Sequence, residues 1–184
     1  MLYSALINDA MAFAAVAHRE QLRKNPKVKI PYIQHAAMVG FILHTAGFDE
    51  EVVAAGILHD VLEDTSTTRQ ELERRFGSRI TELVSSVSEQ DKSLPWETRK
   101  TLSLKQLSRA PEGGLAIAAA DKIHNINCIA GALEGGVAIW DVFKRGREHQ
   151  MARFSRFLEF LQANWNHPLV EELEHTLERL KRLA

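Results

Sequence analysis

The sequence predicts an all-α protein, and three observations support this prediction. Apolar residues recur at helical spacing through nearly the whole chain, and no stretch shows the alternation of apolar and polar residues that is typical of a sheet. The length of 184 residues fits a single domain, for which we expect the boundaries 1–184. Hydrophobic residues make up 45% of the chain and charged residues 26%, as in ordinary globular proteins.

The first two helices are bounded by proline and glycine. We expect a first helix over about residues 3–23, which the segment NPKVKIP ends because Pro26 and Pro31 each disfavour helix at the preceding residue. A second helix is expected over about 35–45, with Gly47 placed where glycine commonly follows a helix end.

Capping residues mark the next helices. Asp49 is a good N-cap for a third helix that carries the segment VVAAGILHDVLED. Thr68 and Glu71 form a capping-box pattern for a short helix that ends at Gly77. The remaining helices are expected over about 78–89, 95–108, 115–133, 139–165 and 168–183.

The last of these helices carries a leucine stripe, which consists of Leu173, Leu177, Leu180 and Leu183. Two uses of the stripe are open. It could form the interface of a homo-oligomer, or it could pack on the bundle of its own chain, which is the more ordinary use of such a stripe.

Net charge and cysteine content indicate which binding partners and which cellular compartment to expect. A net charge of −1 gives no global field that would favour nucleic acid or an anionic membrane, so we expect neither as a partner. The longest uncharged run, residues 30–48, contains proline, glutamine and two histidines and does not qualify as a membrane span. Cys128 is the only cysteine, which favours a reducing compartment and a cytoplasmic protein.

The segment AAGILHDVLEDT, residues 54–65, combines an apolar run with four ionisable residues. On a continuous helix, His59 and Glu63 would share one face, and Asp60 and Asp64 the next. Buried carboxylates are costly unless something compensates them. These side chains therefore either form a solvated face or meet a common partner such as a cation.

Two further segments favour the cation. Asp121 interrupts the apolar run GLAIAAADKIHNIN, and pairing with Lys122 is unattractive because adjacent side chains point to different parts of a helix. His35 begins an otherwise apolar helix. Together, His35, His59, Asp60 and Asp121 would supply two nitrogens and two carboxylates for one divalent metal ion, with positions left open for water.

These motifs resemble a known family. The adjacent pair His59-Asp60 resembles the signature of the HD phosphohydrolase superfamily. The motifs PYIQH, GILHDVLEDT and ADKIHNI, in that order, are similar to the hydrolase domains of RelA/SpoT-type enzymes, in the small stand-alone form of the metazoan SpoT homologue branch. The resemblance implies an HD-domain helical bundle.

The same resemblance implies an activity and roles for single residues. The activity is removal of the 3′-pyrophosphate from guanosine tetra- or pentaphosphate, which yields pyrophosphate and GDP or GTP, with Mn²⁺ held by His35, His59, Asp60 and Asp121. Glu63 and Asp64 match an acidic pair that positions and activates the attacking water. The residues that match the nucleotide site are Arg23, which would stack on guanine, Lys24, which would approach phosphate, and Asn125.

Other interpretations stay open. The family usually has an arginine where this chain has Asn127, so another nucleotide or phosphoester is an alternative substrate for the same metal chemistry. A non-catalytic module that senses a nucleotide is disfavoured, because all six metal and acid positions are filled. Lys92, Arg99 and Lys100 either help to hold phosphates or, as is more ordinary, belong to a solvated helix start.

Overall fold

The structure is a computed structural model that describes residues 3–89 and 93–183. In this part of the chain the regular elements are helices, and the one β-type pairing is an isolated antiparallel bridge between Leu22 and Pro31. The elements are α1 (Ala5–Ala17), α2 (Ile33–Thr45), α3 (Glu50–Ile57), α4 (Val61–Asp64), α5 (Arg69–Val87), α6 (Trp96–Leu107), α7 (Glu112–Glu134), the 3-10 helix η1 (Ile139–Val142), α8 (Gly146–Asn164) and α9 (Pro168–Leu183). The prediction of an all-α fold is confirmed.

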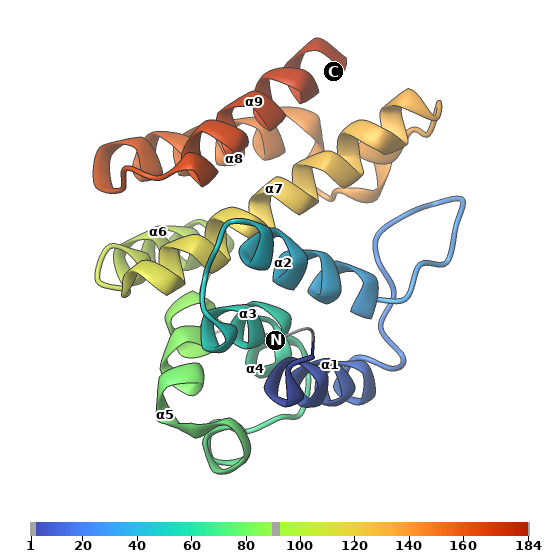
Figure 1. The fold of residues 1–184 in the computed structure, drawn as a ribbon. Helices are drawn as coiled ribbons and strands as arrows, with labels where there is room; N and C mark the ends of the chain where they lie inside the picture. Colours follow the sequence, from blue (N-terminus) through green and yellow to red (C-terminus); the bar gives the residue numbers. More distant parts are fainter. Residues whose placement is uncertain (1–2, 90–92, 184) are drawn as a thin grey trace.

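Helix α7 runs through the middle of the bundle (Figure 1). Helices α1 to α5 lie on one side of it, and α8 and α9 lie on the other. Its neighbours include α2, α3 and α5 on the first side and α9 on the second. A side chain on α7 can therefore contribute to a site together with residues from either half of the chain.

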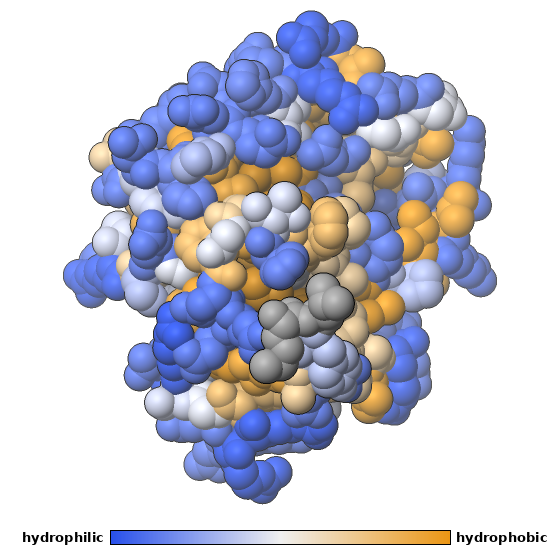
Figure 2. Space-filling view, in the orientation of Figure 1, coloured by the Kyte–Doolittle hydropathy of each residue, from blue (hydrophilic) through white to orange (hydrophobic). Residues whose placement is uncertain are grey.

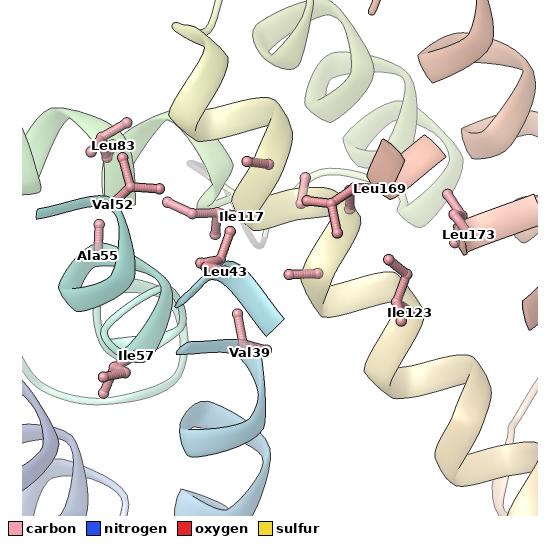
Figure 3. Packing of buried hydrophobic residues seen from close by; sticks show 14 of the residues in the cluster. Val39, Leu43, Val52, Ala55, Ile57, Leu83, Ile117, Ile123, Leu169 and Leu173 are labelled. Atoms are coloured by element: carbon pink, nitrogen blue, oxygen red, sulfur yellow. The ribbon is translucent and has the colours of Figure 1, made fainter. Parts of the chain in front are cut away.

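A hydrophobic cluster joins the two sides. It extends from Ala10 of α1 to Leu180 of α9, and Figure 3 shows Val39, Leu43 and Ile117 in its centre. In the face drawn in Figure 2, hydrophilic side chains gather over the upper helices, and apolar ones show through mainly in the middle of the view. None of the described helices is long and apolar enough to cross a membrane. The expectation that 1–184 forms one domain stays a prediction.

The leucine stripe of α9 packs inside the protein. Leu173, Leu177 and Leu180 are buried, and Leu183 at the end of the helix is 38% exposed. Since α9 packs against α7 and α8, most of the stripe is used within its own bundle. Homo-oligomerisation stays a prediction.

Two expected helices are shorter than the sequence suggested. The first ends at Ala17, since residues 18–32 form a loop in which the Arg23 N–H donates to the Ile30 carbonyl over 2.9 Å. The expected helix over 139–165 is divided into η1 and α8, and Gly146, with φ of 70°, begins the second part. At Gly77, φ is 82°, so the expected break lies inside α5.

The expected third helix is also broken, at the pair His59-Asp60. It ends at Ile57, and residues 58–60 form a turn before the short α4 begins at Val61. The premise of one continuous helix through this segment is therefore wrong, and with it the pairing of His59 with Glu63. Asp60 and Asp64 do lie one turn apart as expected, because the Asp64 N–H donates to the Asp60 carbonyl over 2.8 Å. The turn instead places His59 and Asp60 at the end of α3, next to α2 and α7.

Helices α2 and α3 approach each other closely at two glycines. A Cβ atom at Gly40 would lie 2.5 Å from Ile57 Cγ1, and one at Gly56 would overlap the Leu43 side chain. Only glycine fits either position without displacing its neighbour. This contact sets the separation of α2, which carries His35, from α3, which leads into the turn that carries His59.

Candidate metal centre and substrate cleft

Three potential metal donors meet where α2, the turn after α3 and the middle of α7 come together. Among the described residues, His35, His59 and Asp121 each offer one atom, and these atoms lie within 4.8 Å of one another. Asp121 Oδ1 is 3.2 Å from His35 Nε2 and 3.9 Å from His59 Nε2. Both histidines are buried, with 1% and 4% of their surface exposed.

The orientation of His59 is set by its own turn. Its Nδ1 lies 2.8 Å from the Gly56 carbonyl oxygen, which leaves Nε2 facing the centre of the group. That nitrogen is buried and has no hydrogen-bond partner in the described residues, although Asp60 Oδ2 is 2.9 Å away. Burial opposes protonation, but Asp60 and Asp121 outweigh it and raise the pKa of His59 to about 9.

Asp60 lies next to this group and not within it. Besides its contact with His59, its Oδ2 accepts a hydrogen bond from the Tyr32 hydroxyl. Burial opposes its ionisation, yet the adjacent His59 and the Tyr32 hydrogen bond lower the pKa of Asp60. Burial and the Asp60 carboxylate raise the pKa of Tyr32, which stays a donor. The motif PYIQH alone assigned no role to Tyr32. The structure shows that its hydroxyl orients Asp60.

His35 is oriented by a second buried histidine. Its Nδ1 lies 2.6 Å from His124 Nδ1, and His124 Nε2 lies 3.5 Å from Cys128 Sγ and 3.4 Å from Gln34 Nε2. Burial, followed by the charge of nearby groups, lowers the pKa of His124 to about 4, so this ring is neutral at pH 7. Sequence analysis did not single out His124; its spacing from Asp121 on α7 was the available signal.

The expectation that Asp121 does not pair with Lys122 is wrong. Lys122 Nζ donates to Asp121 Oδ2, and the Asn125 amide donates to Asp121 Oδ1. The lysine side chain is long enough to reach the neighbouring carboxylate, so adjacency in sequence does not prevent the contact. Asp121 is thereby held between a cation one residue along and an amide one turn along.

Glu63 and Asp64 are held by backbone and side-chain donors from other segments. Glu63 Oε2 accepts from the Glu89 backbone N–H over 3.1 Å, and burial together with the nearby acids raises the pKa of Glu63. Asp64 Oδ2 accepts from Gln21 Nε2 over 3.3 Å, and Gln21 Oε1 lies 2.6 Å from His18 Nδ1. Gln21 is a neighbour of the acidic pair that sequence reasoning missed.

The expected nucleotide residues lie together on one wall. Arg23 Nη2 donates to Asn125 Oδ1 over 2.6 Å, and its guanidinium lies 5.6 Å from the centre of the Tyr32 ring. Lys24 Nζ lies 5.6 Å from the centre of the Phe143 ring. The loop over residues 18–32 therefore lies against α7, and Arg23, Lys24 and Asn125 line a shared cleft.

This cleft has a volume of about 930 Å³ and extends well beyond the donor group. One part is lined by His59, Asp60, Glu63, Asp64 and Asp121, and another by side chains of α6 and α8. Arg99 and Lys100 do not form a solvated helix start, because both pair with the buried carboxylate of Glu89. Lys92 lies outside the described residues.

Asn127 does not line the cleft. Its amide donates to the Ile123 carbonyl over 3.0 Å, and its Oδ1 accepts from Arg179 of α9 over 2.9 Å. Arg179 also makes a two-pronged contact with Glu134. Asn127 thus joins α7 to α9, so it no longer argues for a different substrate.

The donor set fits a divalent transition metal ion. Imidazole nitrogen and carboxylate oxygen are ligands that Mn²⁺, Fe²⁺, Co²⁺ and Zn²⁺ all accept. The buried, unpartnered Nε2 of His59 is the specific observation in favour, since a cation would satisfy that nitrogen and compensate the adjacent carboxylates.

Similarity to known proteins agrees with this geometry. Residues 10–139 match the family described as HD domain. The guanosine-3′,5′-bis(diphosphate) 3′-pyrophosphohydrolase MESH1 of Homo sapiens is 42% identical over 125 residues, which are 67% of this chain and 69% of the human protein. The Xenopus tropicalis protein of the same name is 40% identical over the same shares of both chains.

Solved structures give the same result. The structure of a metazoan orthologue of SpoT that hydrolyses ppGpp superposes with a TM-score of 0.81 at 28% identity and covers 97% of each chain. A protein from Listeria monocytogenes gives a TM-score of 0.72 at 32% identity and covers 83% of this chain and 99% of that one. The chain belongs to the HD-domain family, in the branch of metal-dependent hydrolases that contains the metazoan SpoT homologues.

Proposed function

We propose that this protein hydrolyses guanosine 3′,5′-bis(diphosphate) to GDP and pyrophosphate. The observation that carries the proposal is one cleft that joins a group of metal donors, an acidic pair and a cationic nucleotide wall. The named activity of the MESH1 relatives and of the SpoT orthologue supports the same substrate. Water would add to the phosphorus bound to the ribose 3′-oxygen, and the bond from that phosphorus to the 3′-oxygen would break.

The metal would be a single Mn²⁺ ion held by His35, His59, Asp60 and Asp121. When bound, such an ion neutralises charge on the phosphoryl oxygens and lowers the pKa of water. Asp60 would approach it from the edge of the donor group, where Tyr32 and His59 hold its carboxylate. Cys128 is the only cysteine, which also supports a cytoplasmic protein.

Glu63 and Asp64 would orient the attacking water and accept its proton. The Glu89 N–H and Gln21 hold the two carboxylates in place. The raised pKa of Glu63 suits a general base, because a carboxylate of higher pKa accepts a proton more readily. The same group, once protonated, can return that proton to the departing 3′-oxygen.

The nucleotide would lie against Arg23, Lys24 and Asn125. A planar guanidinium can stack on guanine, and the hydrogen bond from Arg23 to Asn125 fixes its plane. Lys24 would approach phosphate as a point charge. The whole chain, 1–184, would act as one domain on a small-molecule nucleotide, with neither nucleic acid nor a membrane as partner.

Product analysis tests the proposal. Protein stripped of metal is re-supplied with Mn²⁺ and guanosine tetraphosphate, beside an Asp60→Ala variant. Release of pyrophosphate and GDP by the wild type and its loss in the variant are expected. If the wild type binds Mn²⁺ tightly without turnover, the substrate assignment is wrong; if it binds no metal, the assigned site is wrong.

A further inference from the structure

One part of the cleft is formed by α8, which lies beyond the residues that match the HD-domain family. The match to the HD domain ends at residue 139, whereas α8 begins at Gly146. Yet α8 contributes Arg153, Arg156 and Phe157 to the cleft that contains the acidic pair. This wall is therefore built from residues outside the segment that defines the family.

Cations from three helices meet at this wall. Lys100 of α6 and Lys122 of α7 line the same cleft as Arg153 and Arg156. The Lys122 ammonium lies 5.5 Å from the centre of the Phe157 ring, which ties α7 to α8 at this point. Burial first, and then the positive charge of Arg153, lowers the pKa of Lys100, which agrees with the crowding of these groups.

The acidic side chains near these cations are too few to neutralise all of them. Glu89 is shared by Arg99 and Lys100, Asp121 pairs with Lys122, and Glu97 pairs with Arg145. Glu148 lines the cleft as an exposed residue. The guanidinium groups of Arg153 and Arg156 make no hydrogen bond or ion pair with any residue in 3–89 or 93–183. The Arg153 guanidinium lies 5.9 Å from the centre of the adjacent Phe154 ring, and its charge also acts on Glu89. Both arginines thus line the cleft with N–H groups that have no acceptor among the described residues.

We propose that Arg153 and Arg156, together with Lys100 and Lys122, form a second anion site that binds the 5′-diphosphate of the nucleotide. The inference rests on the proposed function, since it places the 3′-diphosphate at the metal donors. A guanosine bis(diphosphate) carries two anionic groups on opposite sides of its ribose, and a cleft of this volume has room for both. Guanidinium groups are well suited to phosphate because they bind it through two parallel hydrogen bonds.

The first test measures hydrolysis kinetics of variant proteins on two substrates that differ in the 5′-diphosphate. Wild type, Arg153→Gln and the matched control Arg147→Gln are compared on guanosine 3′,5′-bis(diphosphate) and on guanosine 3′-diphosphate, which lacks the 5′-group. Arg147 lies on the same helix but is exposed outside this cleft. For Arg153→Gln we expect KM to rise about tenfold on the first substrate alone, with kcat kept, because one charge-assisted contact is lost.

A binding measurement separates failure of this site from failure of the proposed function. GDP and guanosine are titrated into the three proteins by calorimetry without turnover. Weaker GDP binding by Arg153→Gln, with guanosine binding unchanged, supports the anion site even if the wild type fails to hydrolyse the tetraphosphate. Equal GDP binding by all three proteins, or an equal rise of KM on both substrates, overturns the site.

Discussion

The two ends of the cleft are built in different ways. At the metal end, His35, His59, Asp60 and Asp121 each have at least one fixed contact with a neighbouring side chain or carbonyl group. At the α8 end, Arg153 and Arg156 make no hydrogen bond or ion pair with the described residues, and Arg153 only lies against the Phe154 ring. Chemistry requires donors held to within fractions of an ångström, whereas recognition of a phosphate tolerates cations that settle on their ligand. Fixed contacts in this cleft are therefore concentrated where bonds would change.

The largest expected effect is a loss of catalysis without a loss of metal binding. We expect Glu63→Gln to lower kcat about 10²- to 10⁴-fold, as loss of a general base does, with Mn²⁺ affinity unchanged. A base must be ionised, so wild-type activity should fall as pH decreases through the Glu63 pKa, which burial and the nearby acids raise above 4.5. The pH profile of kcat/KM and a metal titration of both proteins measure these effects. Loss of Mn²⁺ binding by the variant would contradict the assigned role.

The next effect concerns how the metal end is held. If His35 Nε2 faces a cation, its Nδ1 carries the proton and donates to His124 Nδ1, which accepts. His124→Leu removes that acceptor and should weaken Mn²⁺ binding about ten- to a hundredfold. His124→Asn should restore most of the affinity, because its Oδ1 is as far along the side chain as Nδ1. Calorimetric titration measures both variants; equal losses would reduce His124 to a packing residue.

A smaller effect tests how the α8 end is supported. Glu89 is 6% exposed in its side chain and holds Arg99 and Lys100, so Glu89→Gln should cost about 2 kcal/mol of unfolding free energy at pH 7. Its neighbouring cations lower the Glu89 pKa below 4.5, so this stabilisation is present above pH 4.5 and is lost as pH falls through the lowered value. Denaturant unfolding at several pH values measures the difference.

A control for that experiment is Glu97→Gln, which removes an exposed partner of Arg145. Exposed ion pairs contribute little to stability, so we expect little change at any pH. If the two variants behave alike, the buried position of Glu89 has no energetic importance.

The smallest effect concerns a position outside the cleft. Asn127→Ala removes the hydrogen bond from Arg179 and should lower the unfolding free energy by about 0.5–1 kcal/mol. KM and kcat should stay as in the wild type, because Asn127 does not line the cleft. Steady-state kinetics and thermal unfolding of the variant measure these quantities, and a raised KM would return Asn127 to the substrate site.

Local signals in the sequence predicted much of the fold. Asp49 and Thr68 cap their helices through side-chain hydrogen bonds as expected, and Gly77 bends the chain where it was expected to. The turn over residues 58–60 could not be predicted, because VVAAGILHDVLED contains no proline and its one glycine, Gly56, lies within α3. Two contacts accompany the break: a local one of the His59 ring with the Gly56 carbonyl, and a tertiary one of Asp60 with Tyr32.

The residues of the candidate site also fall into those that the sequence predicted and those that it did not. Residues that combine polarity with an apolar setting, such as Asp121 and His59, were visible in the sequence. Residues that depend on a partner far away in the sequence could not be identified in this way. Gln21 meets Asp64 across 43 positions, and Arg153 lies on a helix that carried no motif. Spacing along one helix gives no information about such contacts.

The close approach of α2 and α3 at Gly40 and Gly56 has a consequence for mutational tolerance. The missing methyl groups at these positions let α2 and α3 approach each other, and His35 and His59 depend on these two helices for their positions. An alanine at either position would displace Ile57 or Leu43, and such overpacking typically costs about 1–3 kcal/mol. We therefore expect such substitutions to alter metal affinity together with stability, although neither glycine is a metal donor.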